Sequence, residues 1–95
     1  MEVLRPKPLD THAGAKIIAW ARGQLEIAKS ILDNPGGGLL FAAQTIGQVR
    51  AGLHERDPDK WEEVVGILDQ AEDAAVHRDF EQARSLVDSA LKRLQ

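Results

Sequence analysis

The chain has 95 residues, which is enough for one domain with one modest hydrophobic core. Hydrophobic residues make up 43% and charged residues 28% of it, an ordinary globular composition that excludes a wholly disordered chain. It contains no cysteine, which excludes disulfides and thiolate chemistry and fits a reducing, cytoplasmic compartment. We therefore predict a single domain over residues 1–95, with residues 1–9 as an extended or disordered lead.

The formal net charge of −3 is unevenly distributed. Residues 57–95 carry ten acidic and five basic side chains, and no stretch of the chain forms a basic stripe. Because neutralisation of phosphates drives nucleic-acid binding, we expect no nucleic-acid partner. No apolar run approaches the roughly 20 residues that span a bilayer, and no apolar segment follows the N-terminus as in a secretory signal. We expect no membrane partner.

The four prolines indicate a helical chain, because none of them interrupts a periodic apolar segment: Pro6, Pro8, Pro35 and Pro58. Proline inside a helix costs about 3 kcal/mol, so helices are expected between them. Alternating apolar patterns, which would predict strands, are absent from the sequence. The fold class predicted is all-α.

The first predicted helix covers residues 11–33, with Asp10 or Thr11 as its N-cap. At 100° per residue, its apolar residues share one arc: Gly14, Ile17, Ile18, Ala21, Leu25, Ala28 and Leu32. A second row extends that arc to about half of the circumference: Trp20, Ile27 and Ile31. A helix in a four-helix monomer needs only about a third of its surface for the core, so this row is surplus.

The segment Asn34-Pro35-Gly36-Gly37-Gly38 ends this helix, and its three glycines predict a flexible hinge. The second helix is predicted over residues 39–56. Its apolar stripe is narrow: Leu39, Ala42, Ala43, Ile46, Val49 and Leu53. Leu40 and Phe41 lie beside that stripe at the start of the helix.

The third helix is predicted over residues 58–77, because Asp57 suits an N-cap and Pro58 suits the first helical position. The fourth is predicted over residues 79–94, because Asp79 followed by Gln82 resembles a capping box. Only a short turn separates these two helices, which makes them antiparallel neighbours. The prediction is a small up-down four-helix bundle.

The histidines are the first candidates for chemistry. In such a bundle, His12 and His54 lie at one end and His77 at the other, so a three-histidine metal site is not expected. Two alternatives stay open. One is a histidine phosphotransfer-like signalling bundle. The other is a small metal- or RNA-acting helical enzyme, since Arg50-Ala-Gly-Leu-His54 resembles the Arg–His signature of HEPN ribonucleases, with three intervening residues where that family has four to six.

Glu72 stands out because its helical angle places it on the apolar face of the third helix. A carboxylate there either reaches water at the edge of the face or pairs with a cation such as Arg50 on a neighbouring helix. Glu72 and Arg50 are therefore a candidate buried polar pair.

The preferred function is a non-catalytic helical protein-interaction or assembly module without cofactor or metal, most simply a homodimer. The candidate interface consists of Trp20, Ile27, Ile31, Leu40 and Phe41. Exchange of the first helix between two copies, through the hinge at Gly36, Gly37 and Gly38, is one form that the dimer can take. We further expect the hairpin of the last two helices to be the most stable part, and the helix over residues 39–56, weakened by Gly47 and Gly52, to open first.

Overall fold

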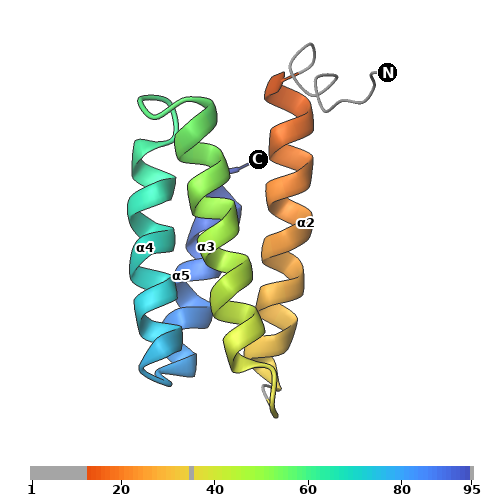
Figure 1. The fold of residues 1–95 in the computed structure, drawn as a ribbon, viewed down its shortest axis with the longest axis vertical. Helices are drawn as coiled ribbons and strands as arrows, with labels where there is room; N and C mark the ends of the chain where they lie inside the picture. Colours follow the sequence, from red (N-terminus) through yellow and green to blue (C-terminus); the bar gives the residue numbers. More distant parts are fainter. Residues whose placement is uncertain (1–12, 35, 95) are drawn as a thin grey trace, which may run out of the picture.

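The computed structural model describes residues 13–34 and 36–94, and the side chains from Lys16 onward within those ranges. In this part of the chain there are four α-helices and no strand: α2 (Ala13–Asp33), α3 (Leu39–Arg56), α4 (Glu62–Val76) and α5 (Phe80–Arg93). They form the predicted all-α up-down bundle (Figure 1). The predictions for residues 1–9, for a cap at Asp10 or Thr11 and for His12 fall outside the described residues.

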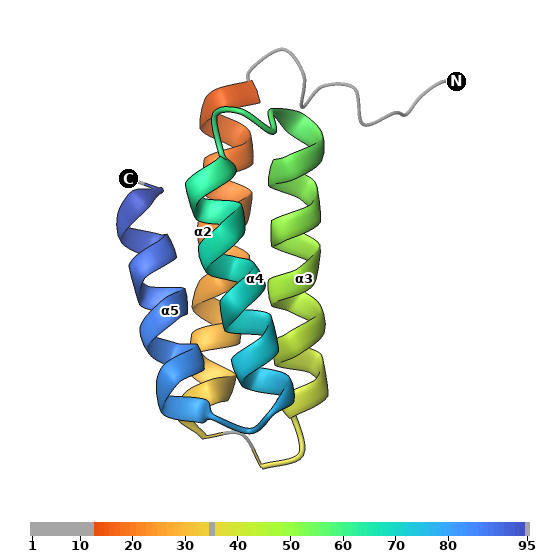
Figure 2. The same ribbon diagram turned by 90° about the vertical axis from the view of Figure 1, so that its left-hand side faces the viewer.

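The helices are arranged in a square in which each one runs antiparallel to the next (Figures 1 and 2). α3 packs against α2 and α4, and α5 packs against α4 and α2. α2 and α4 therefore lie on a diagonal. The contact between α2 and α5 is the least extensive of the four neighbouring pairs.

The core lies inside this square and is built from the predicted apolar stripes. α2 contributes five buried side chains: Ile17, Ala21, Leu25, Ala28 and Leu32. α3 likewise contributes Ala42, Ala43, Ile46, Val49 and Leu53. Burial of each large aliphatic side chain stabilises the fold by about 1.5–3 kcal/mol, which is why the 3.6-residue spacing of these residues selects helices. The one buried residue outside the apolar set, among those described, is Thr45, whose hydroxyl donates to the Phe41 carbonyl at 2.8 Å.

The connection between α3 and α4 corrects the predicted start of the third helix, which is Glu62 and not Pro58. The predicted cap contact does form: the Asp57 carboxylate accepts the Lys60 N–H at 3.2 Å. However, Trp61 has φ −101° and ψ 13°, outside the regular helical region, and the residues from Pro58 to Trp61 form a turn. The Trp61 indole is buried in the core, so the turn serves to position it.

The connection between α4 and α5 is short and fully hydrogen-bonded. The Arg78 N–H donates to the Ala75 carbonyl at 3.0 Å, and the Asp79 N–H donates to the Ala74 carbonyl at 2.9 Å. This is the Schellman pattern, and Arg78 occupies the left-handed position with φ +63°, where glycine is the usual residue. The Asp79 carboxylate then accepts the Gln82 N–H at 3.3 Å, which confirms the predicted cap of the last helix.

The glycine segment between α2 and α3 contributes little packing. Gly36 has φ +47°, and added Cβ atoms at Gly36 and Gly37 would meet nothing within 4 Å. Gly38 precedes α3 and accepts the first helical hydrogen bond, from the Ala42 N–H at 3.0 Å. Gly36 and Gly37 thus add no side-chain packing to the connection between α2 and α3.

Candidate functional site

The side chains of the predicted interface differ in exposure. Trp20 is 39% exposed, Ile27 47%, Phe41 56% and Leu40 71%, whereas Ile31 is half-buried and packs against the core. Ile31 therefore contributes mainly to the fold. The other four residues are candidates for contact with a partner.

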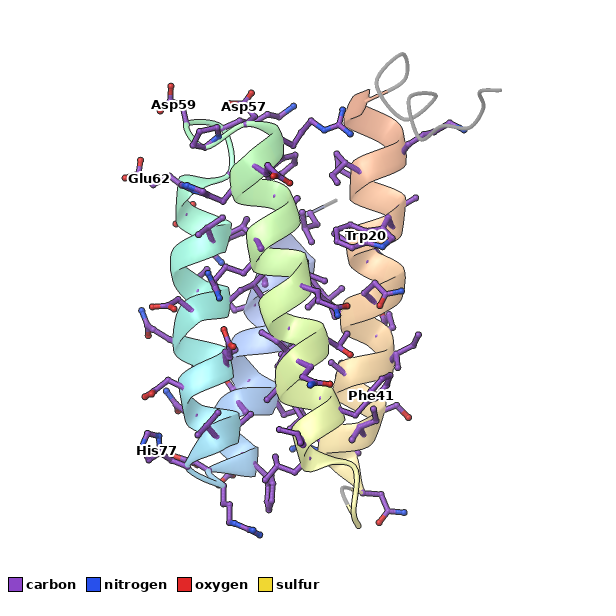
Figure 3. The ribbon with its side chains drawn as sticks, in the orientation of Figure 1. Trp20, Phe41, Asp57, Asp59, Glu62 and His77 are labelled. Atoms are coloured by element: carbon purple, nitrogen blue, oxygen red, sulfur yellow. The ribbon has the colours of Figure 1, made fainter. Side chains whose placement is uncertain are left out.

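Three of these four side chains lie on one side of the bundle. Figure 3 places Trp20 and Phe41 on the same side of the molecule, where α2 and α3 run next to each other. Ile27 follows Trp20 by seven residues, which is two helical turns, and so projects from the same side of α2. We call Trp20, Ile27 and Phe41 the α2/α3 surface. Leu40 is rotated by 100° from Phe41 and lines a separate hollow together with Val76 of α4.

Trp20 is held in place by close contact with α3. A Cβ added to Gly52 would lie 2.9 Å from both Cη2 and Cζ3 of the Trp20 ring, closer than real Cβ atoms approach. Only a glycine at this position lets the indole lie against the α3 backbone. Glycine has a low helix propensity and weakens α3, and the packing of Trp20 explains why it is present at position 52. The outer part of the indole stays accessible to a partner.

Leu40 belongs to a separate hollow of about 370 Å³ at the end of the bundle where the α2–α3 and α4–α5 connections meet. The hollow is lined by Gly36, Gly37, Leu39, Leu40, Ala43, Val76 and Arg78. Val76 is 60% exposed, the largest exposed apolar residue of α4. As the last residue of α4 it lines the hollow opposite Leu39, Leu40 and Ala43 of α3.

Glu72 and Arg50 are brought together across α4 and α3. Arg50 Nε and Nη2 each lie 3.1 Å from Glu72 Oε1, and both side chains are about one third exposed. The Glu72 carboxylate also lies directly over Gly47, where an added Cβ would approach Oε2 to 2.8 Å. The second glycine of α3 thus makes room for an inter-helix ion pair.

Polar contacts close the bundle between α2 and α5; we call them the α2–α5 seam. Lys29 Nζ lies 3.0 Å from Asp88 Oδ1, Arg84 Nη1 lies 2.6 Å from Asp33 Oδ1, and Arg22 donates to the Leu91 carbonyl at 3.4 Å. The hydrogen bond from Lys29, followed by its charge, lowers the pKa of Asp88, and the same contact raises the pKa of Lys29. The hydrogen bond to Asp33 raises the pKa of Arg84.

The two described histidines lie at opposite ends of the bundle. His54 is exposed in the last turn of α3, and His77 follows α4, with Nδ1 donating to the Asp73 carbonyl at 2.8 Å. Among the described residues, no three His, Cys, Asp or Glu side chains come together as a candidate metal site. Over the same part of the chain, no helix combines the length and hydropathy required to cross a bilayer.

Comparisons with protein-family models, with curated proteins and with solved structures each return no match for this chain. The functional assignment therefore rests on the geometry of the α2/α3 surface and on the charges around it.

Proposed function

We propose that this protein is a non-catalytic helical interaction or assembly module that binds another protein through the α2/α3 surface. The observation that carries the proposal is the grouping of three large, exposed apolar side chains on adjacent helices: Trp20, Ile27 and Phe41. Single exposed apolar residues are common on soluble proteins, but a group of them marks a contact surface. Aromatic residues are also enriched among those that dominate binding energy.

The charged groups support the same conclusion because many of them serve the fold. Arg50 pairs with Glu72, Lys29 with Asp88, and Arg84 with Asp33, each between two helices. These pairs link neighbouring helices, and the polar side chains that they use are therefore engaged within the fold. The exposed parts of Trp20, Ile27 and Phe41 are the apolar area that the described fold leaves uncovered on this side.

The partner we propose is a protein and not a nucleic acid or a membrane. The net charge of −3 opposes binding to phosphates, and an apolar surface of three side chains suits a helix or another compact protein face. The proposal includes a cytoplasmic location, which the absence of cysteine supports.

Site-specific photo-crosslinking tests this function. A photoreactive amino acid at Ile27, on the α2/α3 surface, is compared with the same amino acid at Gln70, an exposed residue of α4. We expect protein adducts from position 27, in the purified protein or in the producing cells, and none from position 70. Equal labelling at both positions, or no adduct at either, would contradict the proposal.

A further inference from the structure

We infer that the partner at the α2/α3 surface is a second copy of this chain, with the two α2 helices crossing antiparallel at Gly23 about a two-fold axis. This inference rests on the proposed function, because it names the partner of the same surface. It is carried by an unexplained glycine beside the apolar row, by the distribution of charge and by the size of the surface.

Gly23 differs from the glycines of α3. Added Cβ atoms at Gly47 and Gly52 would collide with Glu72 and Trp20, whereas one at Gly23 would meet nothing within 4 Å. Gly23 is exposed in the middle of α2, where glycine weakens a helix, and no contact among the described residues uses its small size. A close approach by a second backbone would use it.

The spacing of α2 is self-complementary about Gly23. Trp20 precedes Gly23 by three residues and Ile27 follows it by four, so all three lie on the same side of the helix. When two α2 helices cross antiparallel at this glycine, Ile27 of each copy comes level with Ala19 and Trp20 of the other. Ala19 is small and exposed, so Ile27 packs beside the indole without obstruction.

The distribution of charge permits two copies to meet on this side. All five charged residues of α4 are acidic: Glu62, Glu63, Asp69, Glu72 and Asp73. α2 instead carries three basic and two acidic residues and lies diagonally across the bundle from α4. Pairing through α2 keeps the acidic helices of the two copies far apart, where their repulsion is screened. Lys16 of each copy also lies about one turn from the level of Glu26 of the other.

The size of the surface is that of a weak interface. α2 has 21 residues and is therefore about 31 Å long, and two packed helices present a face about 20 Å wide. Such a face buries on the order of 600 Å² per copy, somewhat below the roughly 800 Å² of a standard stable interface. We accordingly expect a weak dimer with a dissociation constant in the micromolar range.

Sedimentation velocity tests the inference over protein concentrations from about 1 to about 500 µM, which spans the expected dissociation constant. Gly23→Gln is compared with Gly66→Gln, a matched control because Gly66 is also exposed, within α4, and a Cβ there would also meet nothing within 4 Å. Both variants should raise the melting temperature of the monomer to a similar extent. We expect dimerisation of the wild type, a loss of about ten-fold or more in affinity for Gly23→Gln, and no change for Gly66→Gln.

Each other outcome overturns a defined part of the account. A wild-type chain that stays monomeric at about 500 µM, while position 27 crosslinks to a different protein, overturns the second copy as partner and leaves the proposed function intact. A dimer that Gly23→Gln and Gly66→Gln affect equally overturns the crossing at Gly23. That result is also expected if α2 is exchanged through Gly36–Gly38, which shortening of the hinge would then reveal as a change in the dimer fraction.

Discussion

The α4–α5 hairpin and helix α2 are held in the bundle by different means. α4 and α5 contact each other extensively and are joined by a Schellman turn followed at once by the Asp79 cap. α2 contacts α5 least, and exposed ion pairs make up much of that seam. Because α2 has the least extensive contact on one side, we expect it to be the helix most easily released, and the α4–α5 hairpin with its hydrogen-bonded turn to act as the scaffold. The apolar side chains of the proposed interface are placed largely on the releasable helix.

Truncation of core leucines should separate the two regions with the largest effect. Leu25 in α2 and Leu68 in α4 are both fully buried, so replacement by alanine should cost about 2–5 kcal/mol in each case. We expect Leu68→Ala to unfold all four helices together, and Leu25→Ala to release α2 while α4 and α5 persist. Urea titrations followed by NMR amide signals would show coincident transitions in the first variant and separate ones in the second. Coincident transitions in both variants would mean that α2 is not a separate unit.

Glycine substitutions sharpen the comparison within the α2/α3 pair. Gly52→Ala should destabilise the protein by about 1 kcal/mol, because overpacking against Trp20 costs about 1–3 kcal/mol and the gain in helix propensity recovers about 1. Gly23→Ala meets nothing within 4 Å and should stabilise the monomer by up to about 1 kcal/mol. Thermal denaturation at low protein concentration measures the stability change of each variant. If Gly52→Ala stabilises the protein, the close packing of Trp20 on α3 does not require glycine at position 52.

The α4–α5 hairpin contains a residue with a strained backbone, Arg78. Its replacement should change the stability by about as much as the glycine substitutions do. Arg78 has φ +63°, a conformation that costs an L-residue with a Cβ about 1 kcal/mol or more relative to glycine. Arg78→Gly should therefore raise the free energy of unfolding by roughly that amount. Chemical denaturation checks the value, with Arg93→Gly, in the last turn of α5, as a control that should destabilise instead.

Strong acid should weaken the α2–α5 seam. Because Lys29 lowers the pKa of Asp88 below its ordinary value of 3.8, the pair contributes stability above that pH and loses it as the pH falls through the folded-state value. Because the pKa of Lys29 is raised above its ordinary value of 10.5, Lys29 keeps its charge and the pair persists at alkaline pH up to about that value or higher. We expect a small loss of α2 docking in acid, monitored by Trp20 fluorescence in a Trp61→Phe background. Asp88→Asn should lose this part of the acid dependence.

Much of the fold was predictable because helix periodicity and capping are local properties of the chain. The bounds of α3, the cap at Asp79 and most of the core stripes of α2 and α3 are confirmed, with Ile18 and Leu39 only partly buried and Gly14 outside the described side chains. The predicted start of α4 was wrong. A turn over residues 58–61 precedes α4 because it buries the Trp61 side chain, and this burial is a tertiary contact. Among the described residues, side chains pack closely against Gly47 and Gly52 but not against Gly23 or Gly66. This difference depends on which helices become neighbours, and periodicity alone does not determine that.

These contacts also change the order in which the helices are expected to open. α3 contains two glycines, but both are packed against side chains, and α3 lies between two neighbours that it contacts extensively. α2 is instead the helix with the weakest contact on one side and the glycine segment at its end. The structure therefore favours α2, and not α3, as the first helix to open.

Native-state hydrogen exchange at two protein concentrations tests the central claim most directly, since association stabilises what it covers by mass action. At about 1 µM the amides of α2 should be the least protected of the four helices and those of the α4–α5 hairpin the most protected. At about 200 µM the protection of α2 should rise while that of the hairpin stays nearly constant. Equal protection of all four helices, or protection of α2 that is independent of concentration, would contradict the division into a stable scaffold and an associating helix.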